Sequence, residues 1–374
     1  MARIVAAAEN FAFGPAGKLM TVVERLAGRG HDVVVAGTGT AYDIASRSPA
    51  VQVVELDTDA PDFTDRGADL VGSADLVLSC MDRSTVRLAR KLGRPTVWLD
   101  TLFWWWDEIP DDLLDVDLYL AQRSVTDRRN AERYAARIPN LVEVGPIVDT
   151  RYAGQAAGQL LVAFGGGEAA GWYRIGEETR FPYVMVDAMR DGLDTSGFSR
   201  VLVTGNAGAM AELARTRDGY EFACLGHDDF LRELGRSDAL LTVPGLETPL
   251  EGWAYRVPTV FLPPSNSSQY VQLDEYVEHG VAAARAHLRD LLPPVELRDR
   301  PLREIMVEFL SLLAEFERRP DLTARAVREV SSHLADRAGW PDLVAVGDRY
   351  LDSLGGPGLD AAVAAVEHLL TTRS

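Results

Sequence analysis

The chain has 374 residues, of which 47% are hydrophobic, and its formal net charge is −18. Its length predicts two domains, and its acidic balance argues against nucleic acid or an anionic membrane as a partner, because phosphate binding needs a basic surface. No apolar run approaches about eighteen residues, and Met1 stands just before a strand-like run, so we expect a cytoplasmic protein without a transmembrane span or signal peptide.

The sequence contains two cysteines and six histidines. Cys80 and Cys224 lie far apart, each in or just after an apolar run, which predicts buried free thiols. The histidines show no zinc-ligand spacing, so we expect neither a metal nor a cofactor. Among 38 basic residues only Lys18 and Lys91 are lysines, which makes Lys18, in the first glycine-rich turn, a candidate functional residue.

Strand-like apolar runs alternate with helical segments over the first 150 residues. The first run, 3–8, leads into a turn that contains Gly14, Gly17 and Lys18, and a helix follows to about Gly28. Such alternation predicts a mostly parallel, doubly wound sheet. Further strands are expected, in chain order, near residues 32–36, 51–56, 75–80, 96–100, 117–120 and 141–144.

The stretch 145–159 has few apolar residues and is the predicted linker between two domains, 1–150 and 151–374. Strands then recur at 160–164, 200–203, 220–225, 239–243 and 258–262. The last part is helical, with helices expected at about 301–318, 321–337, 341–354 and 358–371. The predicted fold class is α/β, with two Rossmann-like doubly wound domains facing a cleft and a helical C-terminal tail. The final helix fits either domain.

The glycine-rich turns match neither common nucleotide-binding fingerprint. Ala12 stands where a phosphate loop of the Walker type needs its first glycine, and no turn has the full GxGxxG spacing. Gly166 and Gly167 could let the backbone approach a donor ligand, with a hinge as the alternative. His227 follows another glycine turn and is a further donor-side candidate, although a helix cap would explain that turn equally well.

The stretch 237–280 has a β-α-β-α order. One apolar run ends at Pro244-Gly245 and a helix follows; a second ends at Pro263-Pro264, and the next helix begins near Gln269. In parallel sheets, ligands lie beyond the carboxyl ends of the strands, where helix N-termini point at them. This stretch therefore predicts a site for an anion.

These residues resemble the donor-binding half of GT-B glycosyltransferases. The matching segments are SDALLTVPGLETPLE (237–251), PTVFLPP (258–264) and Gln269, and the N-terminal half adds the first glycine turn and RGHDV (29–33). The resemblance covers most of residues 1–285. It departs from the macrolide branch, which carries His-Gly-Gly where this chain has Thr-Val-Pro-Gly, so a histidine contact to phosphate is not expected.

The resemblance implies roles for five donor-side residues. Glu251 would bind both ribose hydroxyls of a UDP-sugar, because a carboxylate accepts two O–H donors at once. Gly245, Leu246 and Thr248 would hold the diphosphate through backbone amides and the helix dipole. Gln269 would reach the sugar hydroxyls. A capping or first-turn helix role is the alternative for Glu251 and Gln269.

A narrower resemblance rests on GPAGK (14–18), LFWWWDEIP (102–110), PGLxTxLE (244–251) and PPxNxSQ (263–269). These motifs are similar to those of the cytosylglucuronate and hydroxymethylcytosylglucuronate synthases of nucleoside-antibiotic biosynthesis. That family implies transfer of glucuronate from UDP-glucuronate to cytosine or hydroxymethylcytosine through an N-glycosidic bond, with release of UDP.

Such an inverting transfer needs a base near the incoming nitrogen. Glu9 and Asp100 each follow a strand of the N-terminal domain and are the candidate catalytic acids, with Glu9 preferred. Asn10 and Asp107 remain alternatives for the base. For either acid, a cap or loop role is equally compatible with the sequence.

Acceptor and phosphate contacts have several candidates. Trp104, within the Trp104–Trp106 cluster, could stack on a flat base, while a core plug or dimer patch is the alternative. Lys18 could approach a phosphate or the uronate carboxylate. The arginines that could hold this carboxylate, all near strand-end loops, are Arg83, Arg123 and Arg174.

The leading interpretation is an inverting, metal-independent glycosyltransferase with a UDP-sugar donor and a small-molecule acceptor, and a homodimer is compatible with it. One alternative is a GT-B-fold epimerase or phosphorylase. The other is a sugar-nucleotide-binding protein without catalysis.

Overall fold

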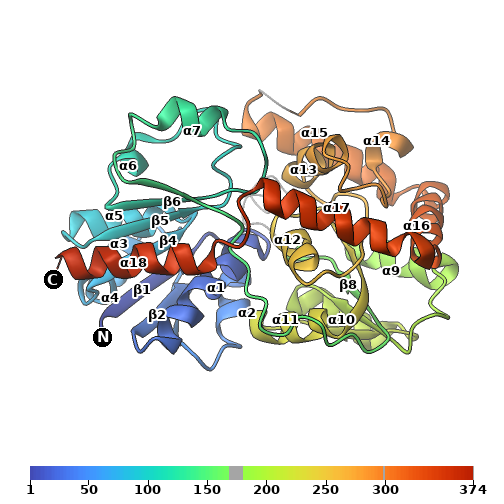
Figure 1. Cartoon of the computed structure of the whole chain (residues 1–374), viewed down its shortest axis with the longest axis horizontal. Helices are drawn as coiled ribbons and strands as arrows, with labels where there is room; N and C mark the ends of the chain where they lie inside the picture. Colours follow the sequence, from blue (N-terminus) through green and yellow to red (C-terminus); the bar gives the residue numbers. More distant parts are fainter. Residues whose placement is uncertain (168–179, 298–299, 374) are drawn as a thin grey trace. The chain divides into compact units, whose positions relative to one another are not determined.

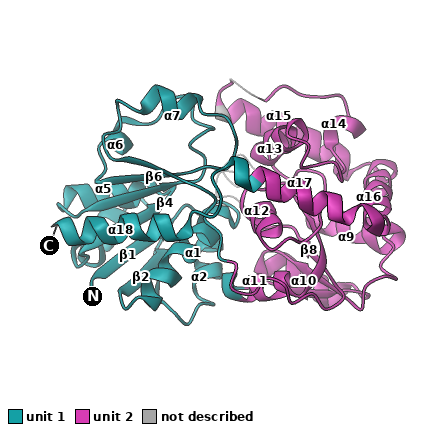
Figure 2. Cartoon of the chain, in the orientation of Figure 1, with its two compact units in different colours: residues 1–149, 226–228, 351–374 teal, residues 150–225, 229–350 magenta. Residues whose placement is uncertain are grey.

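Two parallel β-sheets organise the chain, one in each of two compact units (Figures 1 and 2). The computed structural model describes residues 1–167, 180–297 and 300–373. Unit 1 comprises Met1–Asp149, Gly226–Asp228 and Leu351–Ser374, and unit 2 comprises Thr150–Leu225 and Asp229–Tyr350.

The sheet of unit 1 has the strand order β3-β2-β1-β4-β5-β6-β7. Its inner strands are nearly continuous runs of Val, Ile, Leu and Ala, as expected for a parallel sheet covered by helices on both faces. The order reverses between β1 and β4, where Ala8 pairs with Cys80. The strands are β1 (Arg3–Ala8), β2 (Asp32–Gly37), β3 (Gln52–Glu55), β4 (Leu76–Cys80), β5 (Thr96–Asp100), β6 (Leu118–Gln122) and β7 (Leu141–Val144).

The helices of unit 1 include the last helix of the chain (Figure 2). They are α1 (Gly14–Gly28), α2 (Gly39–Ala45), α3 (Phe63–Arg66), α4 (Ala68–Gly72), α5 (Arg83–Lys91), α6 (Asp111–Leu114), α7 (Arg129–Tyr134) and α18 (Leu359–Arg373).

The position of α18 differs from the expected division at residue 150, which assigned the whole tail to the second domain. Its apolar side, including Val363 and Val366, is part of the core of unit 1. Ion pairs add to this packing, because Arg25 of α1 contacts Asp360 at 3.0 Å. Burial of this apolar side explains why the helix groups with unit 1.

The sheet of unit 2 has the order β10-β9-β8-β11-β12, with every pair parallel. Here the order reverses between β8 and β11, where Ala163 pairs with Thr242. The strands are β8 (Gln159–Ala163), β9 (Arg200–Thr204), β10 (Glu221–Ala223), β11 (Ser237–Thr242) and β12 (Thr259–Phe261).

The helices of unit 2 include most of the C-terminal tail. Two helices cross the division between the units, since the first residues of α11 and the last residues of α17 belong to unit 1. The described helices are α9 (Phe181–Gly192), α10 (Ala207–Thr216), α11 (His227–Gly235), α12 (Glu247–Ala254), α13 (Ser267–Glu278), α14 (Leu288–Leu291), α15 (Leu302–Glu317), α16 (Pro320–Ala335), the 3₁₀ turn η1 (Arg337–Gly339) and α17 (Trp340–Ser353).

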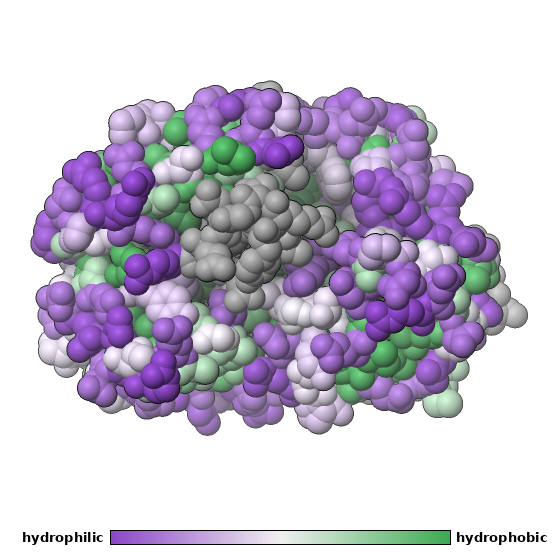
Figure 3. All heavy atoms as spheres, turned by 180° about the vertical axis from the view of Figure 1, so that it is seen from behind, coloured by the Kyte–Doolittle hydropathy of each residue, from purple (hydrophilic) through white to green (hydrophobic). Residues whose placement is uncertain are grey.

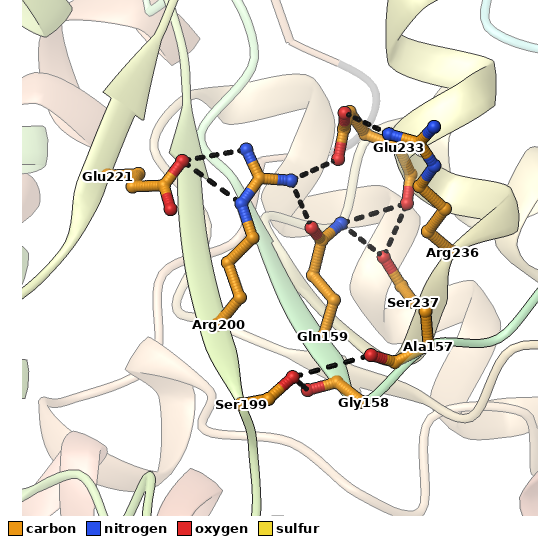
Figure 4. A network of polar contacts seen from close by, with 9 residues as sticks. All are labelled: Ala157, Gly158, Gln159, Ser199, Arg200, Glu221, Glu233, Arg236 and Ser237. Carbon is orange, nitrogen blue, oxygen red and sulfur yellow. Dashed lines mark hydrogen bonds and ion pairs between the residues drawn. The ribbon is translucent and has the colours of Figure 1, made fainter.

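Side chains tie together the amino ends of the strands of unit 2 (Figure 4). Arg200, the first residue of β9, pairs with Glu221 of β10 at 2.7 Å and also contacts Glu233 of α11. Gln159, the first residue of β8, donates to the hydroxyl of Ser237 at 3.1 Å. This edge of the sheet is closed by ion pairs and hydrogen bonds, so a ligand site is expected at the opposite, carboxyl edge.

The predicted α/β class with two doubly wound sheets and a helical C-terminal part is confirmed. Each predicted strand and tail helix is present within two residues at either end. On the face in Figure 3, hydrophilic residues cover most of the surface and hydrophobic ones form separate groups. None of the helices in the described ranges has the length and apolar character needed to cross a membrane.

Candidate functional site

Two acidic residues follow the neighbouring strands β1 and β4 in unit 1. The amide of Glu9 donates to the carbonyl of Cys80 at 3.0 Å, so the β1–β4 ladder continues one residue past Ala8. Met81 follows with φ of 63°, an unfavourable conformation for a residue with a side chain, and Asp82 comes next. Glu9 and Asp82 therefore flank the point where strand order reverses, the usual ligand position in such sheets.

Glu9 combines an exposed side chain with a raised pKa. Desolvation by the surrounding protein, followed by repulsion from Asp82 and Asp59, raises its pKa from 4.5 to about 7. Its side chain is nevertheless open at the surface, so water screens part of the desolvation and the repulsion. A surface carboxyl group whose pKa is shifted upward in this way is suited to accept a proton from a bound molecule.

Asn10, the alternative base, has a structural role in the loop after β1. Its side-chain oxygen accepts from the amide of Thr40 at 3.0 Å and from its hydroxyl at 2.9 Å. Gly39 is at φ +56°, and a Cβ there would lie 2.5 Å from the Asn10 side chain. Asn10 therefore holds the start of α2, and glycine leaves room for it.

Asp100 is fully buried, at 0% exposure. Its carboxylate accepts from the amide of Leu102 at 2.8 Å, the indole of Trp106 at 2.8 Å and the hydroxyl of Tyr119 at 2.5 Å. Burial raises the pKa of Asp100, and these hydrogen bonds oppose that rise. The expected catalytic role does not fit this position, because a base must reach its substrate.

Lys18 is also buried, at 1% exposure. It lies on α1, and its ammonium donates to the carbonyl of Ile147, near the end of the first segment of unit 1. The expected contact with phosphate or a uronate does not fit this placement. Gly14 begins α1, which has no side-chain cap, and Gly17 lies one turn further, where a Cβ would be 3.8 Å from the ring of His227.

His227 is buried and lies at the first residue of α11. Its Nε2 is 3.4 Å from the hydroxyl of Thr21 on α1. The residues 226–228 group with unit 1. His227 therefore contacts α1, and its expected donor contact remains a prediction.

The three tryptophans divide into a packed pair, Trp104 and Trp105, whose ring centroids lie 5.4 Å apart, and Trp106. Trp106 donates to Asp100, whereas Trp104 lines a cavity of about 70 Å³ at the carboxyl ends of β6 and β7. The Trp104 indole nitrogen is buried without a hydrogen-bond partner among the described residues. At about 4.8 Å per strand, β6 lies roughly 14 Å from β1 in the sheet. The cavity is thus a second feature of this edge, separate from Glu9.

The arginines considered for a carboxylate are engaged or lie outside the described residues. Arg83 pairs with Asp112 at 2.6 Å, and Arg123 contacts Glu143 at 3.4 Å. Arg174 falls within 168–179, outside the described residues. A substrate carboxylate at Arg83 or Arg123 would have to replace an acidic side chain.

Glycine-rich loops flank the corresponding strand-order reversal in unit 2. Gly165 and Gly167 after β8 have φ of +66° and +60°, a region that favours glycine. The carbonyl of Gly166 between them accepts from Asn206 at 2.8 Å, and Asn206 also caps α10. This contact fixes the loop, which fits a preformed binding surface better than a free hinge.

Gly245 follows β11, the neighbour of β8. A Cβ at Gly245 would meet no atom of the described residues within 4 Å, so its backbone faces open space among them. Tyr276 of α13 donates to the Gly245 carbonyl at 3.0 Å and holds the turn from the other side. The loops at Gly166 and Gly245 thus present backbone on adjacent strand ends, as a phosphate group requires.

The helix α12 starts directly after this turn. Leu246 is its N-cap and supplies no side-chain hydrogen bond, so no side chain of the cap residue fills the first turn. Thr248 is half-buried in this turn, and Glu251 is buried one turn from Glu247. Glu247 places an acid in the first turn, which would oppose a bound anion.

Gln269 takes part in the N-terminal cap of α13. Its side-chain oxygen accepts from the amide of Ser265 at 2.7 Å, while Asn266 accepts from the amide of Gln269 at 2.9 Å. This reciprocal pair resembles a capping box. The alternative first-turn role is therefore present in the structure. A contact with the sugar would use the side-chain nitrogen, Nε2, of Gln269.

Sequence reasoning missed Asp82 and Asn206. Each follows a predicted strand, the same signal that drew attention to Glu9 and Gly245. Both also cap a helix, since Asp82 accepts from the amide of Thr85 at 2.9 Å and Asn206 accepts from that of Ala209 at 2.8 Å. Asp82 lies at the strand-order reversal of unit 1, and Asn206 follows β9, the other neighbour of β8.

No protein-family model matches the sequence, and no curated protein sequence matches it either. Among solved structures, CalG4, the calicheamicin glycosyltransferase, is 17% identical, with 99% of this chain and 98% of that chain covered and a TM-score of 0.53.

Two further structures are similar along nearly their whole length. Os79 from O. sativa in complex with UDP is 14% identical, with 99% of this chain and 100% of that chain covered and a TM-score of 0.57. The spinosyn rhamnosyltransferase SpnG complexed with thymidine diphosphate is 12% identical, with 98% and 100% covered and a TM-score of 0.54. These similarities show that the chain shares the two-domain GT-B fold of these proteins.

Proposed function

We propose that the chain is an inverting glycosyltransferase that moves a sugar from a UDP-sugar to a small acceptor. The proposal rests on the different residues that follow the strand-order reversal of each sheet. That of unit 1 carries an accessible carboxyl group with a raised pKa, Glu9. That of unit 2 carries open glycine backbone at Gly245 and the fixed loop at Gly166.

In this proposal the chemistry divides between the two sets of groups. The acceptor nitrogen or oxygen attacks the anomeric carbon of the sugar and forms the new glycosidic bond. Its proton goes to the Glu9 carboxylate, and the bond from the anomeric carbon to the diphosphate breaks with both electrons on the leaving oxygen. Amides near Gly245, with those of Leu246 and Thr248, stabilise the leaving diphosphate.

In this proposal the nucleotide part of the UDP-sugar binds at α12 and α13. Glu251 would bind the ribose hydroxyls, and the amide of Gln269 would reach the sugar. The solved relatives include one with UDP and one with thymidine diphosphate. A ribose 2′-hydroxyl is present only in the first, so the two-hydroxyl role of Glu251 favours UDP.

The finer proposal is glucuronate transfer to cytosine or hydroxymethylcytosine, and it is supported by the motifs at 14–18, 102–110, 244–251 and 263–269. In this proposal the pyrimidine lies at Glu9, and a longer acceptor would extend toward the cavity at Trp104. Comparing the rate of transfer to cytosine with the rate of transfer to longer nucleoside-like acceptors separates these two cases.

The test is a transfer assay with mass-spectrometric detection. Purified protein is incubated with UDP-glucuronate, UDP-glucose or thymidine-diphosphate glucose, each with cytosine. We expect a product with the combined mass of cytosine and glucuronate less one water, together with free UDP. Binding of UDP without any transfer to a panel of small acceptors would instead support a non-catalytic binder and would overturn the transferase.

A further inference from the structure

Asp82 is the acidic residue nearest in sheet order to Glu9. The two follow adjacent strands, and the β1–β4 ladder reaches Glu9 itself through its bond to Cys80. The Asp82 side chain is 5% exposed, in contrast to the exposed Glu9. A buried acid beside an accessible one can act on it through charge without touching the substrate.

We propose that Asp82 is a positioning residue that sets the protonation of Glu9 and thereby the pH range of the reaction. This inference rests on the proposed function for its biological meaning, although the interaction between the two carboxyl groups can be measured without a substrate. Asp82 would not contact the reacting atoms. It would make Glu9 a stronger base by disfavouring its charged form.

The conformation before Asp82 and the contacts after it fix its direction. Met81 is at φ 63°, and the hydroxyl of Ser79 donates to the Asp82 carbonyl at 2.6 Å. The Asp82 side chain then accepts from the amide of Thr85 at 2.9 Å. The residue is held from both sides, so its charge acts from a fixed place.

The charges around Glu9 are acidic. Asp82, after β4, and Asp59, in the loop after β3, both raise its pKa. Lys18 on α1 is the nearest lysine in the sequence, but its ammonium is bound to the carbonyl of Ile147. Burial raises the pKa of Asp82 as well, opposed by the Thr58 hydroxyl and the Thr85 amide. Burial therefore raises the pKa of both carboxyl groups, and the charge of one acts on the titration of the other.

A helix cap is the competing explanation for Asp82, and one substitution separates the two. Asp82→Asn keeps an oxygen that accepts from Thr85, and Asn caps a helix about as well as Asp. It removes the charge and replaces the other carboxylate oxygen by an amide nitrogen. Asp59→Asn is the matched control, because Asp59 also raises the pKa of Glu9 but contributes less than Asp82.

The experiment is a carboxyl-carbon NMR titration of Glu9 in the full-length free protein labelled at glutamate, with Glu9→Gln used to assign the signal. We expect the pKa of Glu9 to fall in Asp82→Asn while burial still keeps it above 4.5, and to fall less in Asp59→Asn. With substrates, the acid limb of the kcat/KM profile should move to lower pH in Asp82→Asn.

An unchanged Glu9 pKa in a folded Asp82→Asn protein would overturn the inference and leave Asp82 as a cap. That result would not affect the proposed transferase, which is decided by the transfer assay. Conversely, the wild-type protein could lack transferase activity while the Glu9 pKa falls in Asp82→Asn. That result would support the interaction between the two carboxyl groups and contradict the proposed function.

Discussion

The two units share one topology and use it in opposite ways. In each, the first strand lies between the second and a later strand, so the order reverses beside β1 in unit 1 and beside β8 in unit 2. Unit 1 places Glu9 and Asp82 there, whereas unit 2 places the glycine loops at Gly166 and Gly245. The same fold position can therefore carry proton chemistry or anion binding, depending on a few loop residues.

The contrast extends to what surrounds each position. In unit 1 burial and the neighbouring acids raise the pKa of Glu9. In unit 2 no side-chain cap occupies the start of α12, and Asn206 holds the carbonyl of Gly166. If this contrast is correct, changes in unit 1 should alter turnover and changes in unit 2 should alter nucleotide affinity.

The largest effect is expected from Glu9→Gln. Glutamine keeps the size of the side chain but cannot accept the proton, so kcat should fall by about 10²- to 10⁴-fold. The affinity for UDP should stay unchanged in a calorimetric titration. Glu55→Gln, at an exposed end of β3, is the control and should keep full activity. Equal activity of Glu9→Gln and wild type would remove Glu9 from the mechanism.

Asp100→Ala should act on stability. The substitution leaves the indole of Trp106 and the hydroxyl of Tyr119 without their buried acceptor, and each such loss costs about 1–3 kcal/mol. Urea unfolding should show a free energy of unfolding lower by about 3 kcal/mol or more. Asp107→Ala, on the exposed part of the same loop, should be nearly neutral. A stable but inactive Asp100→Ala protein would return Asp100 to the catalytic candidates.

Gly245→Ala should weaken nucleotide binding with little effect on folding. Within the described part of the chain, the added methyl group meets no atom within 4 Å, but it would stand where the diphosphate approaches the backbone. We expect UDP to bind about tenfold more weakly, equal to about 1.4 kcal/mol. Gly28→Ala, which also has open space around it, is the control. Unchanged UDP affinity in Gly245→Ala would argue against this loop as the diphosphate site.

The smallest effect concerns the pH dependence of stability. Glu9 keeps its proton up to about pH 7 when folded, whereas the unfolded chain releases it near 4.5. Folding therefore takes up a proton between these values, and the contribution of Glu9 to stability falls as pH rises through this window. Glu9→Gln should raise Tm relative to wild type at pH 8 and leave it nearly unchanged at pH 4.5. The reverse trend would show a lowered Glu9 pKa.

The fold could be predicted from the sequence because short apolar runs and glycine turns alternate along both halves. The exposed Glu9 and the open backbone of Gly245 were found from the same signal. The burial of Asp100 could not be found, because it depends on Trp106 and Tyr119, which the chain brings together from different elements. The contact of Lys18 with the Ile147 carbonyl could not be found for a similar reason, since the two residues lie 129 positions apart.

The most direct test of the account is hydrogen exchange measured by mass spectrometry with and without UDP. We expect slower exchange in the peptides that carry Gly165–Gly167 and 243–251 in unit 2, and no change around Glu9 in unit 1. Protection around Glu9 with none at Gly245 would contradict the assignment of the nucleotide to unit 2.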